Sequence, residues 1–243
     1  MPAADLYEVF TSIQGEGIYT GKRQIFVRFA GCNLDCHYCD TKHAFLKPHS
    51  AKFENSPLSQ IFYDERNPIP AFRLKEYIDL CYTLDTSIHS ISLTGGEPLL
   101  QAEFLEFFLR IYKNNHIFHL ETNGTLPENL KQIIDYIDFV SMDIKLPYLG
   151  DNAFVKKQID FLNIAYKKPL QVKTVVTKKD SLDYFRIALS IVKGVSAEIP
   201  LILQPDTRDM PDIDFLFLLQ KEAGSILKDV RILPQMHSFL GIK

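Results

Sequence analysis

Short apolar segments alternate with amphipathic segments along most of this chain, and this alternation constrains the fold more strongly than any other feature. Six segments are rich in β-branched or aromatic residues and run into polar, glycine- or proline-containing loops, as strands do: 24–29, 90–93, 117–121, 139–142, 172–176 and 201–204. Strands that alternate with helices form βαβ units around a parallel sheet. The pattern predicts an α/β fold with roughly six parallel strands, in a partial or closed barrel or in an open sheet.

Helices are predicted between these strands. Apolar residues recur at i, i+3, i+4 and i+7 from Leu74 and again from Leu130. Four further segments are helical but more evenly apolar: 103–113, 152–166, 182–193 and 213–223. We expect one domain over residues 1–243. Residues 44–72 contain four prolines, and we expect there an irregular insertion with one short helix rather than a domain.

The overall charge and the N-terminal residues exclude several classes of partner. The net charge is −3 and the pI is near 6.2, so no excess of Lys or Arg predicts nucleic acid or an anionic membrane as a partner. The first ten residues include Asp5 and Glu8 and lack the apolar core of a signal peptide. No apolar run approaches the roughly 20 residues that span a bilayer. We therefore expect a cytoplasmic protein.

Polar and glycine-containing motifs follow five of the six predicted strands. They are Gly31–Asp40, Thr94–Pro98, Glu121–Gly124, Asp143–Lys145 and Gln204–Pro205. In parallel α/β folds the carboxyl ends of the strands carry the functional site. We therefore expect these motifs to form one composite site.

The first of these motifs contains Cys32, Cys36 and Cys39 in the spacing C-x3-C-x2-C. Thiolates suit zinc and iron–sulfur clusters. A closed zinc site takes four ligands, but Cys81 belongs to an apolar helix face and His37 would strain the loop. Three thiolates around a four-iron cluster leave one iron open for a substrate or cofactor. A zinc knuckle or an electron-transfer cluster remains an alternative on spacing alone.

Two motifs together resemble the radical S-adenosylmethionine superfamily. One is the cysteine spacing with an aromatic residue, Tyr38, directly before Cys39. The other is Gly95-Gly96-Glu97-Pro98 after a predicted strand, which alone could be an ordinary turn. The resemblance implies a partial TIM-like β/α barrel, a 4Fe–4S cluster on the three cysteines, and reductive cleavage of S-adenosylmethionine.

Further stretches resemble one family within it, the 7-carboxy-7-deazaguanine synthases of queuosine biosynthesis. They are Thr11–Gly17, Phe29–Leu34, Cys39–Thr41, Glu121–Gly124, Gln204–Pro205 and Gln235–Lys243. The resemblance implies a carbon–nitrogen lyase that acts on 6-carboxy-5,6,7,8-tetrahydropterin. A 5′-deoxyadenosyl radical takes the hydrogen from C6, the ring contracts, ammonia leaves, and the radical recovers its hydrogen. Magnesium assists.

The same resemblance assigns roles to individual residues. The pterin would meet Ile13, Gln14, Gly15, Arg28, Thr94 and the terminal carboxylate of Lys243. Thr41 would be a ligand of the magnesium ion. The S-adenosylmethionine contacts would be Tyr38, Cys39, Asp40, Gly96, Glu97, Ser141, Asp143, Lys145, Gln204 and Asp206. Plain structural alternatives exist for several: an ion pair for Arg28, a helix N-cap for Thr41, and caps for Glu121 and Asn123.

Two departures from the family pattern leave competing functions open. Ser141-Met-Asp-Ile-Lys145 replaces the expected Ser-Pro-Lys, and its Asp143-Ile-Lys145 part is similar to glycyl-radical activases. The terminal Gly-Ile-Lys also differs from the family ending. A non-enzymatic iron–sulfur or zinc module is the other competitor, although it would need neither Arg28 nor the motif at 95–98. The family further implies a flavodoxin- or ferredoxin-type reductant and a homodimer.

Overall fold

The computed structural model describes residues 2–113 and 116–242. The chain divides into two compact units. The first comprises Met1–Gln14, Gly21–Thr122 and Gln132–Asp138, and the second comprises Gly15–Thr20, Asn123–Lys131 and Phe139–Lys243. The expectation of a single domain stays a prediction. Among the described helices, none has both the length and the apolar character that a membrane span requires.

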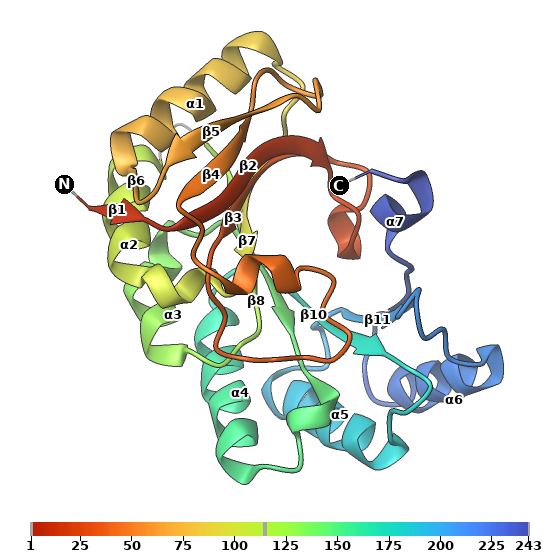
Figure 1. The fold of residues 1–243 in the computed structure, drawn as a ribbon. Helices are drawn as coiled ribbons and strands as arrows, with labels where there is room; N and C mark the ends of the chain where they lie inside the picture. The colour runs from red at the N-terminus through yellow and green to blue at the C-terminus, as the bar shows by residue number, and fades with distance from the viewer. Residues whose placement is uncertain (1, 114–115, 243) are drawn as a thin grey trace. The chain divides into compact units, whose positions relative to one another are not determined.

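In the first unit, strands of mixed direction pair side by side (Figure 1). Their order is β5 (Phe62–Arg66), β4 (Ser50–Glu54), β2 (Leu6–Ile13), β3 (Arg23–Phe29), β7 (Ser90–Gly95), β8 (Phe118–Thr122). Strands β3, β7 and β8 run parallel, whereas β2 is antiparallel to β3 and β5 to β4. A two-stranded ladder joins β1 (Ala3–Ala4) to β6 (Ile69–Pro70), and the helices are α1 (Ala71–Leu84) and α2 (Ala102–Tyr112).

The two faces of this sheet differ in chemistry because strand side chains alternate. On one face Phe29 of β3 and Phe118 of β8 contact Phe104 and Phe108 of α2, with ring centroids 6.2 and 6.1 Å apart. On the other face of β7 lie Ser90, Ser92 and Thr94, which are also buried. The apolar face forms the core, and the polar face is available for function.

The prediction of an irregular insertion at 44–72 is wrong. Residues 50–54 and 62–66 form β4 and β5, and β4 extends the sheet beside β2. Phe53 is buried against Tyr77 of α1, with ring centroids 5.1 Å apart. The Glu54 carboxylate accepts hydrogen bonds from the backbone and hydroxyl of Thr11 at 2.8 and 2.7 Å. The prolines lie outside the two strands, so they do not interrupt the pairing.

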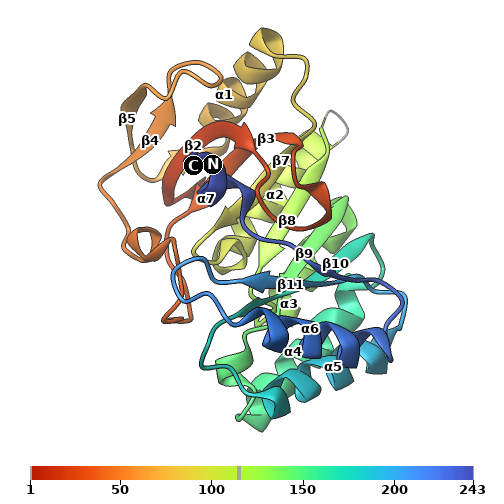
Figure 2. The ribbon, with the colours of Figure 1, turned by 90° about the vertical axis from the view of Figure 1, so that its right-hand side faces the viewer.

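In the second unit, parallel strands pair side by side in the order β12 (Val230–Ile232), β11 (Leu201–Pro205), β10 (Leu170–Val176), β9 (Phe139–Asp143). Its helices are α4 (Asn152–Ala165), α5 (Leu182–Val195) and α6 (Ile213–Gly224), which lie together below β10 and β11 in Figure 2, and the short α7 (Met236–Leu240). All residues of β9, β10 and β11 are buried, as parallel strands usually are. The helix predicted from Leu130 begins earlier, as the seven-residue α3 (Pro127–Ile133), and continues into a 3-10 turn at Ile134–Tyr136.

The six predicted strands and the main predicted helices are therefore confirmed within two or three residues at their ends. Two helix starts are fixed by side-chain caps: Asp151 accepts from the backbone of Ala153, and Ser181 accepts from that of Asp183. Strands β2 and β12 were not predicted. In β2 the polar residues Glu8, Thr11 and Ser12 interrupt the apolar pattern, but all three are buried.

Candidate active site

The three clustered cysteines lie in the loop after β3. Cys36 is buried and Cys32 and Cys39 are half-buried, and all three are thiols rather than disulfides. The Cys39 amide donates to the Cys36 carbonyl at 3.1 Å, which closes a tight turn. Burial is the main cause that raises the pKa of the Cys32 thiol, and nearby Glu97, Cys36 and Cys39 add to it. A cationic metal centre would offset the cost of ionising the Cys32 thiol.

The loop at 95–98 packs directly against the backbone that leads into the cysteines. The Gly96 amide donates to the Phe29 carbonyl at 3.0 Å, and the Glu97 amide donates to the Gly31 carbonyl at 2.8 Å. A Cβ on Gly96 would lie 1.9 Å from the Gly31 oxygen, and Gly95 has a φ of +128°. Only glycines permit this approach. The two motifs that carry the radical S-adenosylmethionine resemblance are therefore joined by hydrogen bonds.

The side chain of Glu97 is fully buried within this loop. It accepts from the Leu99 amide at 3.1 Å, which caps the turn Pro98–Gln101, and from the Thr122 hydroxyl at 2.9 Å. These contacts tie the loop to the end of β8. The predicted contact of Glu97 with the cofactor stays a prediction.

The polar face of the first unit carries a hydrogen-bonded network centred on Glu121. Its carboxylate accepts from Ser92 at 2.6 Å, from Gln14 at 2.9 Å and from Thr94 at 3.4 Å. Gln14 also donates to Gln24 at 2.9 Å. Glu121 is thus the centre of a polar surface rather than a cap, and it joins two predicted substrate residues, Gln14 and Thr94.

Asn123, the other residue for which a cap was considered, closes a turn within its own loop and does not cap a helix. Its side-chain oxygen accepts from the amide and the hydroxyl of Thr125, the amide at 3.1 Å. The sequence did not separate the roles of Glu121 and Asn123, because both follow the same strand. In the structure their roles differ, because Glu121 bonds side chains of other strands whereas Asn123 bonds Thr125 in its own loop.

Arg28 forms the inter-strand ion pair considered as its alternative role. Its Nε lies 3.0 Å from Glu8, which is its register partner on β2, and its guanidinium lies 5.8 Å from the ring centroid of Phe10. Both side chains are largely buried. Thr41, by contrast, makes no side-chain cap at the turn Lys42–Phe45, and its hydroxyl lies 3.5 Å from the Cys39 sulfur. Thr41 therefore occupies the N-cap position without a side-chain cap hydrogen bond, and its magnesium role stays a prediction.

The second unit brings together three predicted cofactor residues, Asp143, Lys145 and Gln204. Lys145 lies 2.6 Å and Lys173 3.5 Å from the same oxygen, Oδ2, of Asp143. Gln204 donates to Glu16 at 3.1 Å, and Lys173 also forms an ion pair with Glu16. Ser141 accepts from Gln171 at 2.9 Å, whereas Asp206 caps its own loop by accepting from the Arg208 amide at 3.0 Å.

Glu16 and Lys173 were not predicted as site residues. Burial alone would raise the pKa of Glu16, but the Lys173 ammonium and hydrogen bonds from Lys173 and Gln235 outweigh it and lower the pKa to about 2. Glu16 is therefore ionised at neutral pH. A lysine within the apolar run Val172–Val176 is the sequence feature that could have indicated this network.

Two acceptors in this network have no hydrogen-bond donor among the described residues. They are Oδ1 of Asp143 and Oε1 of Gln204, both buried. A buried acceptor left unsatisfied costs about 1–3 kcal/mol. Ribose hydroxyls and an ammonium group are donors, so these two oxygens fit S-adenosylmethionine.

The remaining predicted residues have plainer surroundings. Tyr38 is buried with its ring 4.9 Å from His37, and Asp40 is exposed. Ile13 ends β2, and the Gly15 carbonyl accepts from the Met236 amide at 2.9 Å. Lys243 lies outside the described residues.

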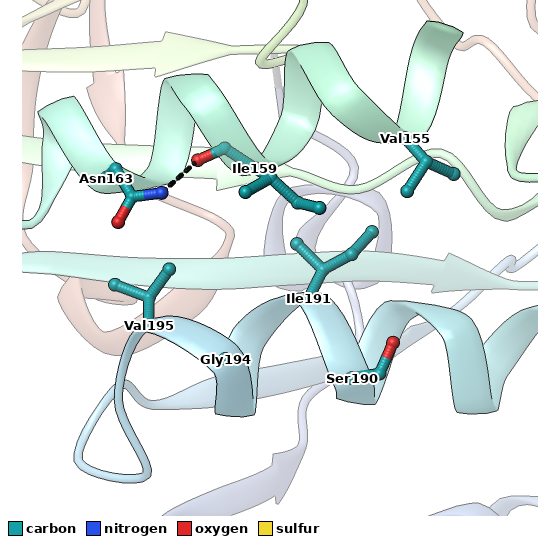
Figure 3. A pocket seen from close by; sticks show the side chains of 7 residues that line it. All are labelled: Val155, Ile159, Asn163, Ser190, Ile191, Gly194 and Val195. Atoms are coloured by element: carbon teal, nitrogen blue, oxygen red, sulfur yellow. Dashed lines mark hydrogen bonds between the residues drawn. The ribbon is translucent and has the colours of Figure 1, made fainter. Parts of the chain in front are cut away.

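A pocket in the second unit contains none of the predicted site residues. Figure 3 shows it between α4 and α5, where Asn163 donates to the Ile159 carbonyl at 2.9 Å. Its lining is mostly apolar: Val155, Ile159, Asn163, Ser190, Ile191, Gly194 and Val195. It therefore adds no chemical group to the candidate site.

Comparison with known proteins identifies the family. The radical SAM superfamily matches residues 26–171. The 7-carboxy-7-deazaguanine synthase of Geobacter sulfurreducens is 37% identical over 246 residues and that of Methanothermobacter thermautotrophicus 34% over 263 residues; each alignment covers 99% of this chain and 98% of the relative. The chain belongs to the 7-carboxy-7-deazaguanine synthase family. This family membership implies a 4Fe–4S cluster and S-adenosylmethionine as cofactors, as predicted.

A solved structure supports the fold assignment. The crystal structure of QueE from Escherichia coli has a TM-score of 0.63 at 20% identity and covers 97% of this chain and 95% of its own. The likeness confirms the predicted fold class, a radical SAM α/β fold of the partial TIM-like barrel type. The near-full-length relatives also disfavour the two competitors, a glycyl-radical activase and a non-enzymatic metal module.

Proposed function

We propose that this protein is a radical S-adenosylmethionine enzyme that converts 6-carboxy-5,6,7,8-tetrahydropterin to 7-carboxy-7-deazaguanine with loss of ammonia, a step of queuosine biosynthesis. The observation that carries the proposal is the 37% identity to a named synthase over almost the whole chain. The hydrogen-bonded contact between the cysteine loop and the loop at 95–98 supports it.

Cys32, Cys36 and Cys39 would hold the 4Fe–4S cluster. When bound, the cluster supplies the electron that cleaves S-adenosylmethionine to a 5′-deoxyadenosyl radical. Gly96 lets the chain backbone come close to the methionyl part of the cofactor. The buried oxygens of Asp143 and Gln204 would accept hydrogen bonds from its hydroxyl or ammonium donors. Tyr38, Cys39, Asp40, Glu97, Ser141, Lys145 and Asp206 complete the proposed cofactor contacts.

The pterin would bind to the polar face of the first unit, where Gln14, Thr94 and Glu121 already share hydrogen bonds. An amide and a carboxylate suit the donors and acceptors of a pterin ring. Arg28 would hold the substrate carboxylate, because a guanidinium that bonds Glu8 through Nε has its terminal nitrogens left for a second carboxylate. Ile13, Gly15 and the Lys243 carboxylate would complete the substrate contacts.

Magnesium and two protein partners belong to the same proposal. The Thr41 hydroxyl is a hard oxygen ligand of the kind that Mg²⁺ takes, with waters and a substrate carboxylate to complete its shell. A flavodoxin- or ferredoxin-type protein would supply the electron, and the enzyme would act as a cytoplasmic homodimer. Light scattering of the reconstituted protein tests the last point, since a monomer at micromolar concentration would contradict it.

The decisive experiment is anaerobic incubation of the reconstituted, dithionite-reduced protein with the tetrahydropterin and S-adenosylmethionine, followed by mass spectrometry. We expect the deazapurine and ammonia. Cys36→Ala should abolish both product and 5′-deoxyadenosine, whereas Cys81→Ala, which changes a buried cysteine of α1, should retain them. Absence of product with a fully loaded cluster, or zinc without iron in the purified protein, would refute the proposal.

A further inference from the structure

Glu16 is the centre of a polar cluster that links four separate segments of the second unit. Its carboxylate pairs with Lys173 of β10 and accepts from Gln204 of β11 at 3.1 Å and from Gln235 at 2.8 Å. The side chains of Glu16 and Lys173 are only 15% and 11% exposed. Removing a carboxylate and an ammonium from water costs free energy that their pairing only partly offsets, so stability alone does not explain the cluster. A role in orienting neighbouring polar groups does.

The same pair of residues contacts the two side chains, Gln204 and Asp143, whose buried oxygens lack donors within the described part of the chain. Glu16 accepts from Nε2 of Gln204, and Oε1 of that amide has no donor among the described residues. Lys145 lies 2.6 Å and Lys173 3.5 Å from Oδ2 of Asp143, and Oδ1 has no donor among the described residues. Gln204 and Asp143 are 1% and 8% exposed, so water is largely excluded from both. Glu16 thus orients the amide of Gln204, and Lys145 together with Lys173 orients the carboxylate of Asp143.

The pair also anchors the C-terminal segment Gln235–Ile242. Helix α7 within this segment has no buried residue, and Phe239 is 85% exposed, so apolar packing does not fix it. Polar contacts do: Gln235 donates to Glu16, and the Met236 amide donates to the Gly15 carbonyl at 2.9 Å. A Cβ on Gly15 would lie 2.2 Å from the His237 ring, so glycine is required for this approach.

We propose that Glu16 and Lys173 are positioning residues for S-adenosylmethionine: they orient the free oxygens of Gln204 and Asp143 toward the hydroxyl or ammonium donors of the cofactor and, through Gln235, couple cofactor binding to docking of the C-terminal segment. The inference rests on the proposed function for the identity of the ligand. Coupling of this kind is reciprocal, so the cofactor must also stabilise the docked segment.

The test combines cofactor affinity with hydrogen exchange, on protein that carries its cluster. In the parent, adding S-adenosylmethionine should slow exchange of residues 236–242 severalfold. Glu16→Gln and Lys173→Met should each weaken S-adenosylmethionine binding about tenfold, as loss of a charge-assisted contact does, and should accelerate exchange of the segment. Arg23→Met is the matched control, because it breaks a half-buried ion pair with Asp85 in the other unit.

Gln235→Ala is the second test variant and serves if the charged variants fail to fold, because it removes only the hydrogen bond from the C-terminal segment to Glu16. It should accelerate exchange of residues 236–242 and weaken cofactor binding at least threefold, and both effects should be absent in Arg23→Met. Faster exchange with cofactor affinity within twofold of the parent would overturn the coupling. Failure of the proposed function would instead appear as normal cofactor binding without deazapurine product.

Discussion

Gly96→Ala tests whether close packing between the two motifs holds the cysteine loop in place. The new Cβ would lie 1.9 Å from the Gly31 oxygen, whereas real Cβ contacts are not shorter than 3.0 Å, so the backbone must separate by at least 3.0 − 1.9 = 1.1 Å. That movement breaks the 2.8 Å bond from the Glu97 amide to Gly31 and disturbs the 3.0 Å bond from Gly96 to Phe29. Buried backbone groups left without partners cost about 1–3 kcal/mol each, so we expect a loss of roughly 2–4 kcal/mol.

The assay is thermal unfolding together with iron content after reconstitution. For a chain of this size 1 kcal/mol lowers the Tm by about 2–4 °C, so Gly96→Ala should lower it by roughly 5–15 °C and reduce the iron bound per chain. Gly194→Ala is the matched control, because a Cβ there meets nothing within 4 Å and the residue lies inside α5, where alanine is favoured over glycine by about 0.5–1 kcal/mol. Equal Tm and iron content in the two variants would refute the packing argument.

Three further predictions follow from individual contacts. Thr41→Ala should reduce magnesium-dependent turnover more than cofactor cleavage, measured as deazapurine against 5′-deoxyadenosine, and equal loss of both would mean that the residue is structural. Thr122→Val should destabilise the fold by about 1–3 kcal/mol, because buried Glu97 loses its 2.9 Å donor, whereas Thr83→Val, which removes an exposed helix contact, should change little. The lowered pKa of Glu16 adds stability that is complete above pH 4.5 and is lost as the pH falls toward 2. The free energy of unfolding of Glu16→Gln should therefore change less with pH between 4.5 and 2 than that of the parent. The same dependence on pH in both proteins would contradict the lowered pKa of Glu16.

The regular elements were predictable where one physical pattern dominates. Strands such as β7 and β10 are β-branched and bounded by polar loops, and the helix from Leu74 has a clear apolar stripe. Strand β4 was missed because the prolines around it outweighed the alternation of Ala51 and Phe53, which are its buried face. Local sequence does not reveal that Thr11 satisfies Glu54 and thereby fixes this strand on the sheet.

The candidate site was predictable where motifs are short and contiguous, as for the cysteines and the loop at 95–98. Pairings between distant residues were not. Glu16 and Lys173 are 157 positions apart, and no sequence pattern around either residue indicates that the two side chains pair. Arg28 was predicted as a substrate clamp, and the sequence could not show that Glu8 stands opposite it across the β2–β3 ladder.

The most direct test of the central claim is turnover of tetrahydropterin labelled with deuterium at C6. If the proposed reaction is correct, the reconstituted protein will form 7-carboxy-7-deazaguanine, and deuterium will enter the 5′-deoxyadenosyl group and return to the product. Cys36→Ala should show neither product nor label transfer. Cofactor cleavage without deuterium transfer from C6, or without the deazapurine, would contradict the account.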